Sequence, residues 1–321
     1  MKAFTYKKYG TSEVLQQSEV AIPKPRPNEI LIKVAALSLN PAEWHKLRAS
    51  LWVLRLSTGL FKPKNQILGA DVAGVVTEVG SNVRSFKVGD KVLGRNYSGG
   101  LATYTCVEAN KAAKIPKDVL FEHAAAIPLA AVTALMALQH QGQIQPKQQV
   151  LINGASGGIG TFAVQLAKFF QAEVTGVCSG KNWPLVRSLG ANKVIDYEQE
   201  DFTQSGKTYD LIIDLVGNRS VTDLKRILKP QGRCILVGFT NAKNMLDFMV
   251  KGKWISGTST QKFIPFNAEV NADSLEYLTR LIRHEDIVPI IDKTYDFDAL
   301  PEAFEHLGSR RARGKIVVKL S

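Results

Sequence analysis

The stretch INGASGGIG, residues 152–160, determines which fold this chain is expected to adopt. It follows the apolar run QQVLIN, and it leads into IGTFAVQLAKFFQ, whose apolar spacing predicts a helix. A strand, a glycine-rich turn and a helix in this order are typical of a dinucleotide-binding fold. Gly157 would let the backbone approach a pyrophosphate, and Gly160 would let the helix pack closely on the sheet.

Ala155 stands where the fingerprint has its first glycine. An alanine fits there only if its φ is negative. The helix N-terminus would then offer free N–H groups and the positive end of its dipole to phosphate groups. The alternative is a plain strand–helix turn. We predict that the turn binds a dinucleotide through six residues: Ala155, Ser156, Gly157, Gly158, Ile159 and Gly160.

The pattern of the whole chain predicts two kinds of structure. The first 115 residues or so contain short apolar runs separated by glycine and proline, which predict strands and turns. The Ala- and Leu-rich residues 121–142 predict helix, with Pro128 as an interruption or a helix start. Strand and helix patterns then alternate, as in AEVTGVC and WPLVRSLGA. Repeated units of this kind predict a parallel, doubly wound sheet.

Composition limits the function classes. The 321 residues suggest two domains, and 45% hydrophobic with 22% charged residues is ordinary for a globular protein. No run reaches the roughly 18 apolar residues of a membrane span, and no signal peptide is recognised, so we expect a cytoplasmic protein. Three separated cysteines form no disulfide framework or metal motif. The net charge of +12 is scattered, which favours a solvated surface over a nucleic-acid face, although RNA stays an alternative.

The second strand of the doubly wound unit predicts which dinucleotide binds. NAD enzymes place Asp or Glu at the end of this strand, on the ribose diol. Here Cys178 and Ser179 stand there, and Lys181 follows. A hydroxyl donor and a lysine in place of a carboxylate favour the 2′-phosphate of NADPH, although Lys181 is alternatively an ordinary surface lysine.

Six motifs resemble one family over nearly the whole chain: LSLNPAEWHKLR (37–48), LGADVAGVVTEVG (68–80), VGDKVLG (88–94), AAAIPLAAVTAL (124–135), NGASGGIG (153–160) and GKIVV (314–318). They are similar to the zinc-free quinone oxidoreductase branch of the medium-chain dehydrogenases/reductases. The resemblance implies an α/β protein. A GroES-like β-domain would span residues 1–118, a Rossmann domain with a doubly wound parallel sheet 119–262, and residues 263–321 would return to the first domain. It also implies an active cleft between the domains.

Zinc relatives hold a catalytic metal at positions that correspond to Asn40, Ala70 and Leu129, and none of these side chains is a zinc ligand. Glu43, His45 and Asp71 are ligand types, but their spacing fits no standard site, so we expect no metal. Without a Lewis acid, a simple carbonyl is hard to reduce. A quinone or an α,β-unsaturated ketone or aldehyde spreads the developing charge, so modest hydrogen-bond donors suffice.

The resemblance also implies individual site residues. Asn40 would position the acceptor or the nicotinamide ribose, and otherwise caps a loop before Pro41. His45 is at the position where many relatives have a tyrosine that could donate a proton, and it would then be the proton donor; the alternative is an exposed loop histidine. Thr133 would lie near the cofactor. Tyr197 would flank the adenosine phosphate, and Lys315 would help to bind phosphate beside the more exposed arginines 310, 311 and 313.

Further cofactor contacts follow from the topology. The carboxyl ends of parallel strands face the ligand crevice of a doubly wound sheet. Four predicted strand-end residues are therefore cofactor contacts, with a core position as the alternative for the last: Val216, Gly217, Gly238 and Phe239.

The leading function is reduction of a quinone or conjugated carbonyl by NADPH. Reduction of an enoyl thioester is the second enzymatic interpretation. A non-catalytic NADPH-binding or sensor protein is a third, from a different class. The apolar loop 48–66 would build the acceptor pocket, and relatives suggest a homodimer formed through an edge strand, for which KWISGTS (253–259) is the candidate.

Overall fold

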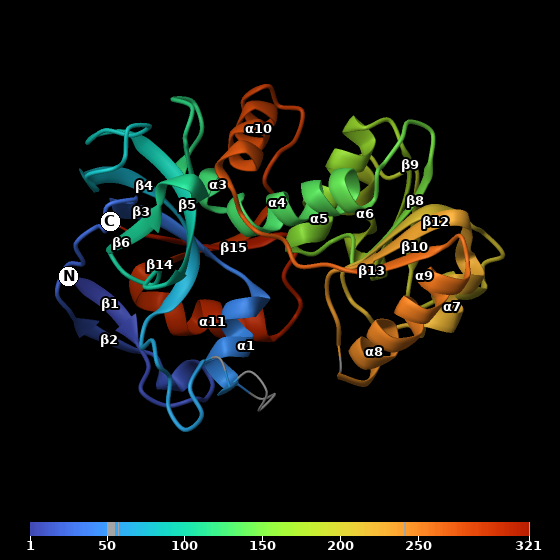
Figure 1. Ribbon diagram of the computed structural model, residues 1–321, viewed down its shortest axis with the longest axis horizontal. Coiled ribbons are helices and arrows are strands. Elements are labelled where there is room, and N and C mark those ends of the chain that lie inside the picture. The colour runs from blue at the N-terminus through green and yellow to red at the C-terminus, as the bar shows by residue number, and fades with distance from the viewer. Residues whose placement is uncertain (50–54, 57, 241, 321) are drawn as a thin grey trace. The chain divides into compact units, whose positions relative to one another are not determined.

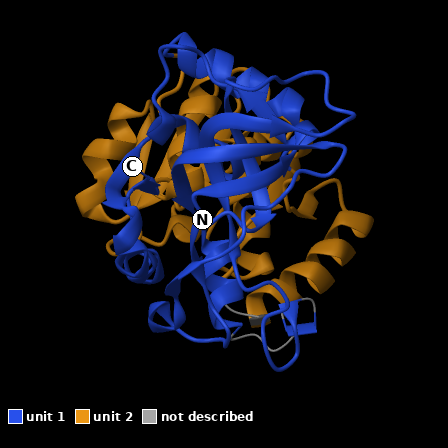
Figure 2. Ribbon diagram, turned by 90° about the vertical axis from the view of Figure 1, so that its left-hand side faces the viewer, with its two compact units in different colours: residues 1–130, 270–285, 289–321 blue, residues 131–269, 286–288 orange. Residues whose placement is uncertain are grey.

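The structure is a computed structural model that describes residues 1–49, 55–56, 58–240 and 242–320 (Figure 1). The chain forms two compact units, coloured separately in Figure 2. Unit 1 contains residues 1–130, 270–285 and 289–321, and unit 2 contains residues 131–269 and 286–288. The sequence-based boundaries at 118 and 262 lie earlier in the chain. Three segments make the difference: residues 119–130 belong to unit 1, whereas residues 263–269 and 286–288 belong to unit 2.

Unit 2 has the parallel sheet that the alternating pattern predicts. Its six strands run in the order β10-β9-β8-β11-β12-β13, and every adjacent pair is parallel. The order reverses between β8 and β11, which is the switch point where doubly wound sheets bind ligands. The strands are β8 (Gln149–Asn153), β9 (Glu173–Cys178), β10 (Lys193–Asp196), β11 (Tyr209–Asp214), β12 (Leu228–Leu236) and β13 (Lys262–Pro265).

Helices connect these strands on both faces of the sheet, as Figure 1 shows. Right-handed crossovers place the helices after β8 and β9 opposite those after β11 and β12, because the two halves of the sheet grow in opposite directions. The helices are α5 (Gly158–Phe169), α6 (Trp183–Ser188), α7 (Val221–Ile227), α8 (Ala242–Asp247) and α9 (Lys253–Thr258), with a π-helical segment, Phe248–Gly252, between the last two.

The segment 253–259 is therefore not the edge strand that we expected from its sequence. It continues the helical run that starts at α8, and the edge strand is β13. Phe248 and Ile255 are seven residues apart and both are buried, which is the spacing of one helix face.

Unit 1 is built on a seven-stranded, mainly antiparallel sheet in the order β14-β15-β3-β4-β5-β7, with β6 paired to β3. The two C-terminal strands join this sheet, as the family resemblance implies. Its strands are β3 (Glu29–Leu39), β4 (Leu68–Val79), β5 (Lys91–Ser98), β6 (Tyr104–Glu108), β7 (Ala112–Lys114), β14 (Ile291–Asp296) and β15 (Lys315–Lys319), and a separate hairpin pairs β1 (Lys2–Thr5) with β2 (Gln16–Glu19).

The other helices are α1 (Pro41–Arg48), α3 (Phe121–Ala125), α4 (Pro128–Leu135), α10 (Ala272–Arg283) and α11 (Leu300–Gly308). Pro128 starts α4, since its missing N–H is one that the first turn leaves unpaired in any case. The first residues of α4 lie in unit 1 and the rest in unit 2. No helix among the described residues is long and apolar enough to cross a membrane.

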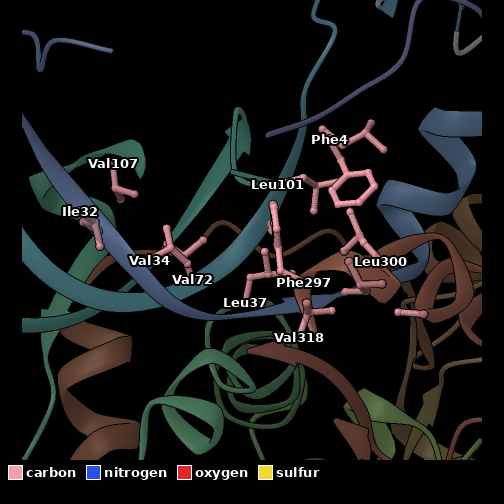
Figure 3. Packing of buried hydrophobic residues seen from close by; sticks show 14 of the residues in the cluster. Phe4, Ile32, Val34, Leu37, Val72, Leu101, Val107, Phe297, Leu300 and Val318 are labelled. Carbon is pink, nitrogen blue, oxygen red and sulfur yellow. The ribbon is translucent and has the colours of Figure 1, made fainter. Parts of the chain in front are cut away.

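The core of unit 1 lies between its sheet and α11. Figure 3 shows side chains from distant parts of the chain in one cluster, including Phe4, Leu37, Phe297 and Val318. Phe4 and Phe297 meet edge to face, with ring centroids 5.2 Å apart. The C-terminal segment is thereby tied to the N-terminal strands by apolar packing.

We expect Leu37→Ala to lower the free energy of unfolding by about 2–5 kcal/mol, because Leu37 is fully buried in this cluster and its loss leaves a cavity. Val88→Ala is the control: Val88 is 63% exposed, and a change below about 0.5 kcal/mol is expected. Urea unfolding of both variants makes the comparison. Equal effects of the two substitutions would contradict the placement of Leu37.

Candidate active site

The glycine turn between β8 and α5 accommodates an alanine at position 155, because the residue before it takes the left-handed backbone conformation. Gly154 carries the left-handed backbone, with φ of +90°, whereas Ala155 is buried and is not among the residues with positive φ. The glycine that the tight turn needs has moved one residue toward the strand. Gly160 is required for packing, since a Cβ built there would lie 2.1 Å from the Gly154 carbonyl oxygen.

Gly157 has a different environment from Gly160. A Cβ at Gly157 would meet only the Gly154 oxygen, at 3.5 Å, which is an ordinary contact. Gly157 is also the N-cap of α5, and no side chain caps that helix. The turn thus leaves open space beside uncapped N–H groups, as a phosphate-binding turn requires.

Polar side chains organise the switch point of the sheet. Asn153 ends β8 and donates through Nδ2 to Asp214 Oδ1 (2.8 Å), at the end of β11, and to Asn218 Oδ1 (3.0 Å). Asp214 Oδ1 also accepts the N–H groups of Val216 (3.1 Å) and Gly217 (2.9 Å). Burial raises the pKa of Asp214, against the effect of these donors. Sequence analysis missed Asn153 and Asp214, although a polar residue that ends an apolar strand is a recognisable signal.

The predicted strand-end residues of β11 and β12 lie side by side. A Cβ at Gly217, whose φ is +62°, would be 2.4 Å from the Gly238 oxygen. The Gly217 oxygen accepts from Thr240 Oγ1 (3.2 Å) and Asn244 Nδ2 (3.0 Å). Phe239 is 41% exposed, so the core alternative for its side chain does not apply.

The end of β9 brings the turn and the second strand together through Asn182, which sequence analysis did not single out. Asn182 Nδ2 donates to Ser156 Oγ (3.0 Å) and to Ser179 Oγ (3.2 Å). Each hydroxyl therefore accepts one bond and keeps its own hydrogen to donate. Asn182 Oδ1 is buried and has no hydrogen-bond partner among the described residues. An orphaned acceptor beside two available donors fits the hydroxyl and phosphate groups of a nucleotide.

Tyr197 and Lys181 lie at the same edge of the sheet. The Tyr197 N–H donates to the Cys178 oxygen (3.2 Å), which places the tyrosine beside Ser179, and its side chain is half exposed. Lys181 is exposed in the short 3₁₀ segment Gly180–Asn182.

A carboxylate does lie near this turn, contrary to the sequence-based expectation. Asp196 ends β10, and its Oδ2 would be 2.6 Å from a Cβ built on Gly180. Burial, together with the nearby charge of Asp196, raises the pKa of the Cys178 thiol to about 11. The acid that β9 lacks is thus supplied by the neighbouring strand, which sequence position alone did not indicate.

Unit 1 contains a buried polar cluster around Asn40. Arg95 donates to Asp71 Oδ1 (2.6 Å) and to Glu43 Oε1 (2.8 Å), and all three side chains are almost completely buried. Asn40 Nδ2 donates to Asp71 Oδ2 (3.0 Å), and Lys315 Nζ donates to Asn40 Oδ1. Two carboxylates and two cations therefore compensate one another around one carboxamide.

Local structure explains why these residues meet. Asp71 on β4 is the cross-strand partner of Arg95 on β5, so their opposite charges share one face of the sheet. Asn40 precedes α1, and Glu43 in the first turn reaches back to accept the Asn40 N–H (3.0 Å), as in a capping box. The Leu129 N–H, from α4, also donates to Asp71 Oδ2 (3.1 Å).

Electrostatics within the cluster follow from burial and pairing. Burial alone would lower the pKa of Arg95, but the charges of Glu43 and Asp71 raise it above its usual value. Burial lowers the pKa of Lys315 to about 8, although Asp71 and Glu43 oppose the shift. The Lys315 ammonium faces Asn40 and the Leu39 oxygen (3.0 Å) rather than the surface, which argues against the phosphate contact expected for it. The arginines beside it, at 310, 311 and 313, are exposed.

His45 and Thr133 are not part of this cluster. His45 is partly buried in α1, and burial lowers its pKa, as do the charges of Arg310 and Arg48. A neutral imidazole at neutral pH is a poor acid, which argues against the proton-donor role. Thr133 is buried in the unit 2 part of α4. Of the predicted pocket loop 48–66, residues 50–54 and 57 lie outside the described residues.

Comparisons with known proteins show which family the chain belongs to. Residues 26–117 match the family model described as alcohol dehydrogenase GroES-like domain, and residues 189–318 match zinc-binding dehydrogenase. The chain is 34% identical to the quinone-oxidoreductase QR1, chloroplastic, of Triphysaria versicolor, covering 99% of this chain and 98% of that one. It is 32% identical to the NADPH-dependent alkenal/one oxidoreductase, chloroplastic, of Arabidopsis thaliana, covering 99% and 79%. The chain belongs to the quinone oxidoreductase-like medium-chain dehydrogenases/reductases.

Solved structures show the same fold. The quinone oxidoreductase from Coxiella burnetii superposes with a TM-score of 0.87 at 28% identity, over 100% of this chain and 99% of that one. As a member of this family, the protein is an oxidoreductase that uses a nicotinamide cofactor, and the predicted GroES-like and Rossmann folds are confirmed.

The zinc in one family description does not suit the residues present. Asn40, Ala70 and Leu129 offer no zinc ligand, and the carboxylates of Glu43 and Asp71 are already bonded to Arg95. Within the described part of the chain, no group of three or more His, Cys, Asp or Glu side chains is arranged to hold a metal ion.

The two glycines of the turn allow a paired prediction. Gly157→Ala should leave the thermal midpoint nearly unchanged and weaken nucleotide binding at least tenfold, because the new methyl group fits the protein but occupies the space of the pyrophosphate. Gly160→Ala should lower both the thermal midpoint and binding, because its Cβ collides with backbone. Calorimetry and nucleotide titration measure the two effects. Unchanged nucleotide binding by Gly157→Ala would contradict the phosphate assignment.

Proposed function

We propose that this protein uses NADPH to reduce quinones or α,β-unsaturated ketones and aldehydes, without a metal ion. The observation that carries the proposal is the Asn40 cluster, which provides a fixed hydrogen-bond donor but no set of metal ligands. Relatives named for quinone and for alkenal/one reduction support the same acceptor class.

The nucleotide would occupy the carboxyl ends of the unit 2 strands. N–H groups of the α5 N-terminus would bind the pyrophosphate, and Ser156 and Ser179 would donate to phosphate oxygens or ribose. We propose that five further residues contact the nucleotide near its nicotinamide end: Thr133, Val216, Gly217, Gly238 and Phe239.

When bound at these strand ends, NADPH would be the source of the hydride for the conjugated acceptor. The acceptor then carries an enolate or hydroquinone anion, and the Asn40 Nδ2–H that is not used by Asp71 would stabilise this oxygen. A neutral donor suffices because conjugation delocalises the charge. Water would supply the final proton, because burial and the charges of Arg310 and Arg48 lower the pKa of His45 and make its imidazole a poor acid.

Preference for NADPH over NADH would depend on Ser179, Lys181 and Tyr197, against the repulsion of Asp196. A hydrogen bond to a charged group contributes roughly 1.5–3 kcal/mol, which corresponds to about tenfold to a hundredfold in affinity. For NADPH to be preferred, the attraction of Lys181 for the 2′-phosphate has to exceed the repulsion by the Asp196 carboxylate. That carboxylate already accepts a hydrogen bond from the Glu198 N–H (3.0 Å).

The proposal also covers the oligomeric state, the cellular location and the absence of a nucleic-acid ligand. A homodimer formed at the β13 edge of the unit 2 sheet, a cytoplasmic location and the absence of a nucleic-acid ligand are our expectations. Light scattering, cell fractionation and RNA titration test them.

An acceptor panel tests the function directly. With NADPH we expect loss of nicotinamide absorbance with quinones or short enones, at a rate well above that with saturated ketones. Faster turnover of an enoyl thioester than of quinones or enones would show that the protein is an enoyl thioester reductase instead. Nucleotide binding without turnover of any conjugated acceptor would favour a sensor or other non-catalytic protein and would refute the proposal.

Two substitutions at the edge of the sheet should act in opposite directions on cofactor choice. Lys181→Ala should weaken NADPH binding at least tenfold and change NADH binding less than threefold. Asp196→Asn should strengthen NADPH binding more than NADH binding, because it removes a negative charge near the 2′-phosphate. Equal effects of Lys181→Ala on both cofactors would eliminate the assignment.

A further inference from the structure

Lys315 is a buried cation for which the proposed reaction has no direct use. It is the first residue of β15, is 3% exposed, and its ammonium donates to the Leu39 oxygen and to Asn40 Oδ1. Asp71 Oδ2 lies 3.9 Å from the same nitrogen. Burial of an ammonium is costly, and a methionine would fill similar space without that cost. The position therefore calls for an explanation beyond packing.

The contacts of Lys315 determine the orientation of the Asn40 carboxamide. The amide has one oxygen and two N–H donors. Its oxygen faces the Lys315 ammonium, and one N–H faces the Asp71 carboxylate. A flipped amide would place its NH₂ group against the ammonium and its oxygen against the carboxylate, turning two attractive contacts into repulsive ones. One N–H of Asn40 is left without an acceptor among the described residues.

We propose that Lys315 is a positioning residue, which fixes the Asn40 carboxamide so that its remaining N–H is presented to the oxygen of the reducible acceptor. This inference rests on the proposed function, in which Asn40 contacts the acceptor. Lys315 acts through Asn40 and touches no reacting atom.

The charged groups that face Lys315 make its effect dependent on pH. Asp71 on β4 and Glu43 on α1 favour the ammonium, while Arg95 on β5 opposes it. With a pKa of about 8, Lys315 is charged at neutral pH and loses its proton in mildly alkaline solution. The cluster then keeps two carboxylates and one guanidinium, and the contact that orients the amide loses its charge. The kcat/KM for the acceptor should therefore fall above pH about 8.

Deprotonation of Lys315 affects the free energy of unfolding in the opposite direction from its effect on kcat/KM. The ordinary pKa of lysine, about 10.5, applies to the unfolded chain, so between the two values the unfolded chain binds more protons. The contribution of Lys315 to stability accordingly rises from pH about 8 to about 10.5. A fall in activity in this window is therefore not explained by unfolding through this group.

The first experiment measures kcat/KM for a quinone against pH, with saturating NADPH. Wild type should lose activity above pH about 8. Lys315→Met should be at least tenfold less active at pH 7 and should lack this alkaline fall, whereas Lys315→Arg, which stays charged, should move the fall to higher pH. Lys319→Met, at an exposed lysine of the same strand, is the matched control and should behave as wild type. An alkaline fall that persists in Lys315→Met would overturn the proposal.

A double-mutant cycle distinguishes an effect of Lys315 through Asn40 from a general structural defect caused by Lys315→Met. Adding Lys315→Met to Asn40→Ala should reduce kcat/KM less than twofold further, because the residue through which Lys315 acts is already gone. Multiplicative losses would show that Lys315 acts independently of Asn40 and would overturn the inference.

A readout that needs no turnover separates this inference from the proposed function. The side-chain amide NMR signals of Asn40 should shift with a midpoint near pH 8 in wild type and not in Lys315→Met. Absence of this shift in wild type overturns the inference. Absence of turnover by wild type, with the shift present, overturns only the proposed function.

Discussion

The pairing of Arg95 with Asp71 and Glu43 is the constraint on which the candidate site depends. The three charges are buried, and removal of one partner from such a group typically costs about 3–5 kcal/mol, because an uncompensated charge remains. The pairing brings α1, β4 and β5 together, and Lys315 adds β15, although Lys315 is 275 residues from Asn40 along the chain. Asn40 is held at the centre of this group. The orientation of the Asn40 side chain therefore depends on residues from four elements of unit 1 and not only on its own loop.

In unit 2 the corresponding constraint is the close approach of backbone at the glycine turn. Gly160 packs against the Gly154 oxygen, and Gly154 takes the left-handed conformation that Ala155 avoids. The Asn153–Asp214 pair then fixes the adjoining strand end at the switch point. Each unit thus contains a set of hydrogen-bond donors, which we propose bind the nucleotide in unit 2 and the acceptor oxygen in unit 1.

The sequence predicted the architecture well, because strand and helix periods and the glycine fingerprint are local signals. Alternating patterns after residue 148 gave the parallel sheet, and Pro128 marked a helix start. The segment 253–259 was misjudged, since its Trp, Ile and Thr residues suit a strand, but Ile255 shares a buried helix face with Phe248.

The site was only partly predictable for a different reason. Asn40 and the glycine turn were found through motifs, whereas the partners of Asn40 depend on strand register. Nothing local connects Asp71 to Arg95 or Lys315 to Asn40, and Lys315 beside three arginines looked like part of a surface cluster. Asp196 was overlooked for the same reason, because it reaches the end of β9 from the neighbouring strand.

A crystal structure with NADPH and a quinone bound together would test the role of Asn40. We expect the quinone oxygen within hydrogen-bond distance of Asn40 Nδ2, while Asn40 Oδ1 still accepts from the Lys315 ammonium. A quinone oxygen held by another side chain, or Lys315 turned onto a phosphate group, would contradict it.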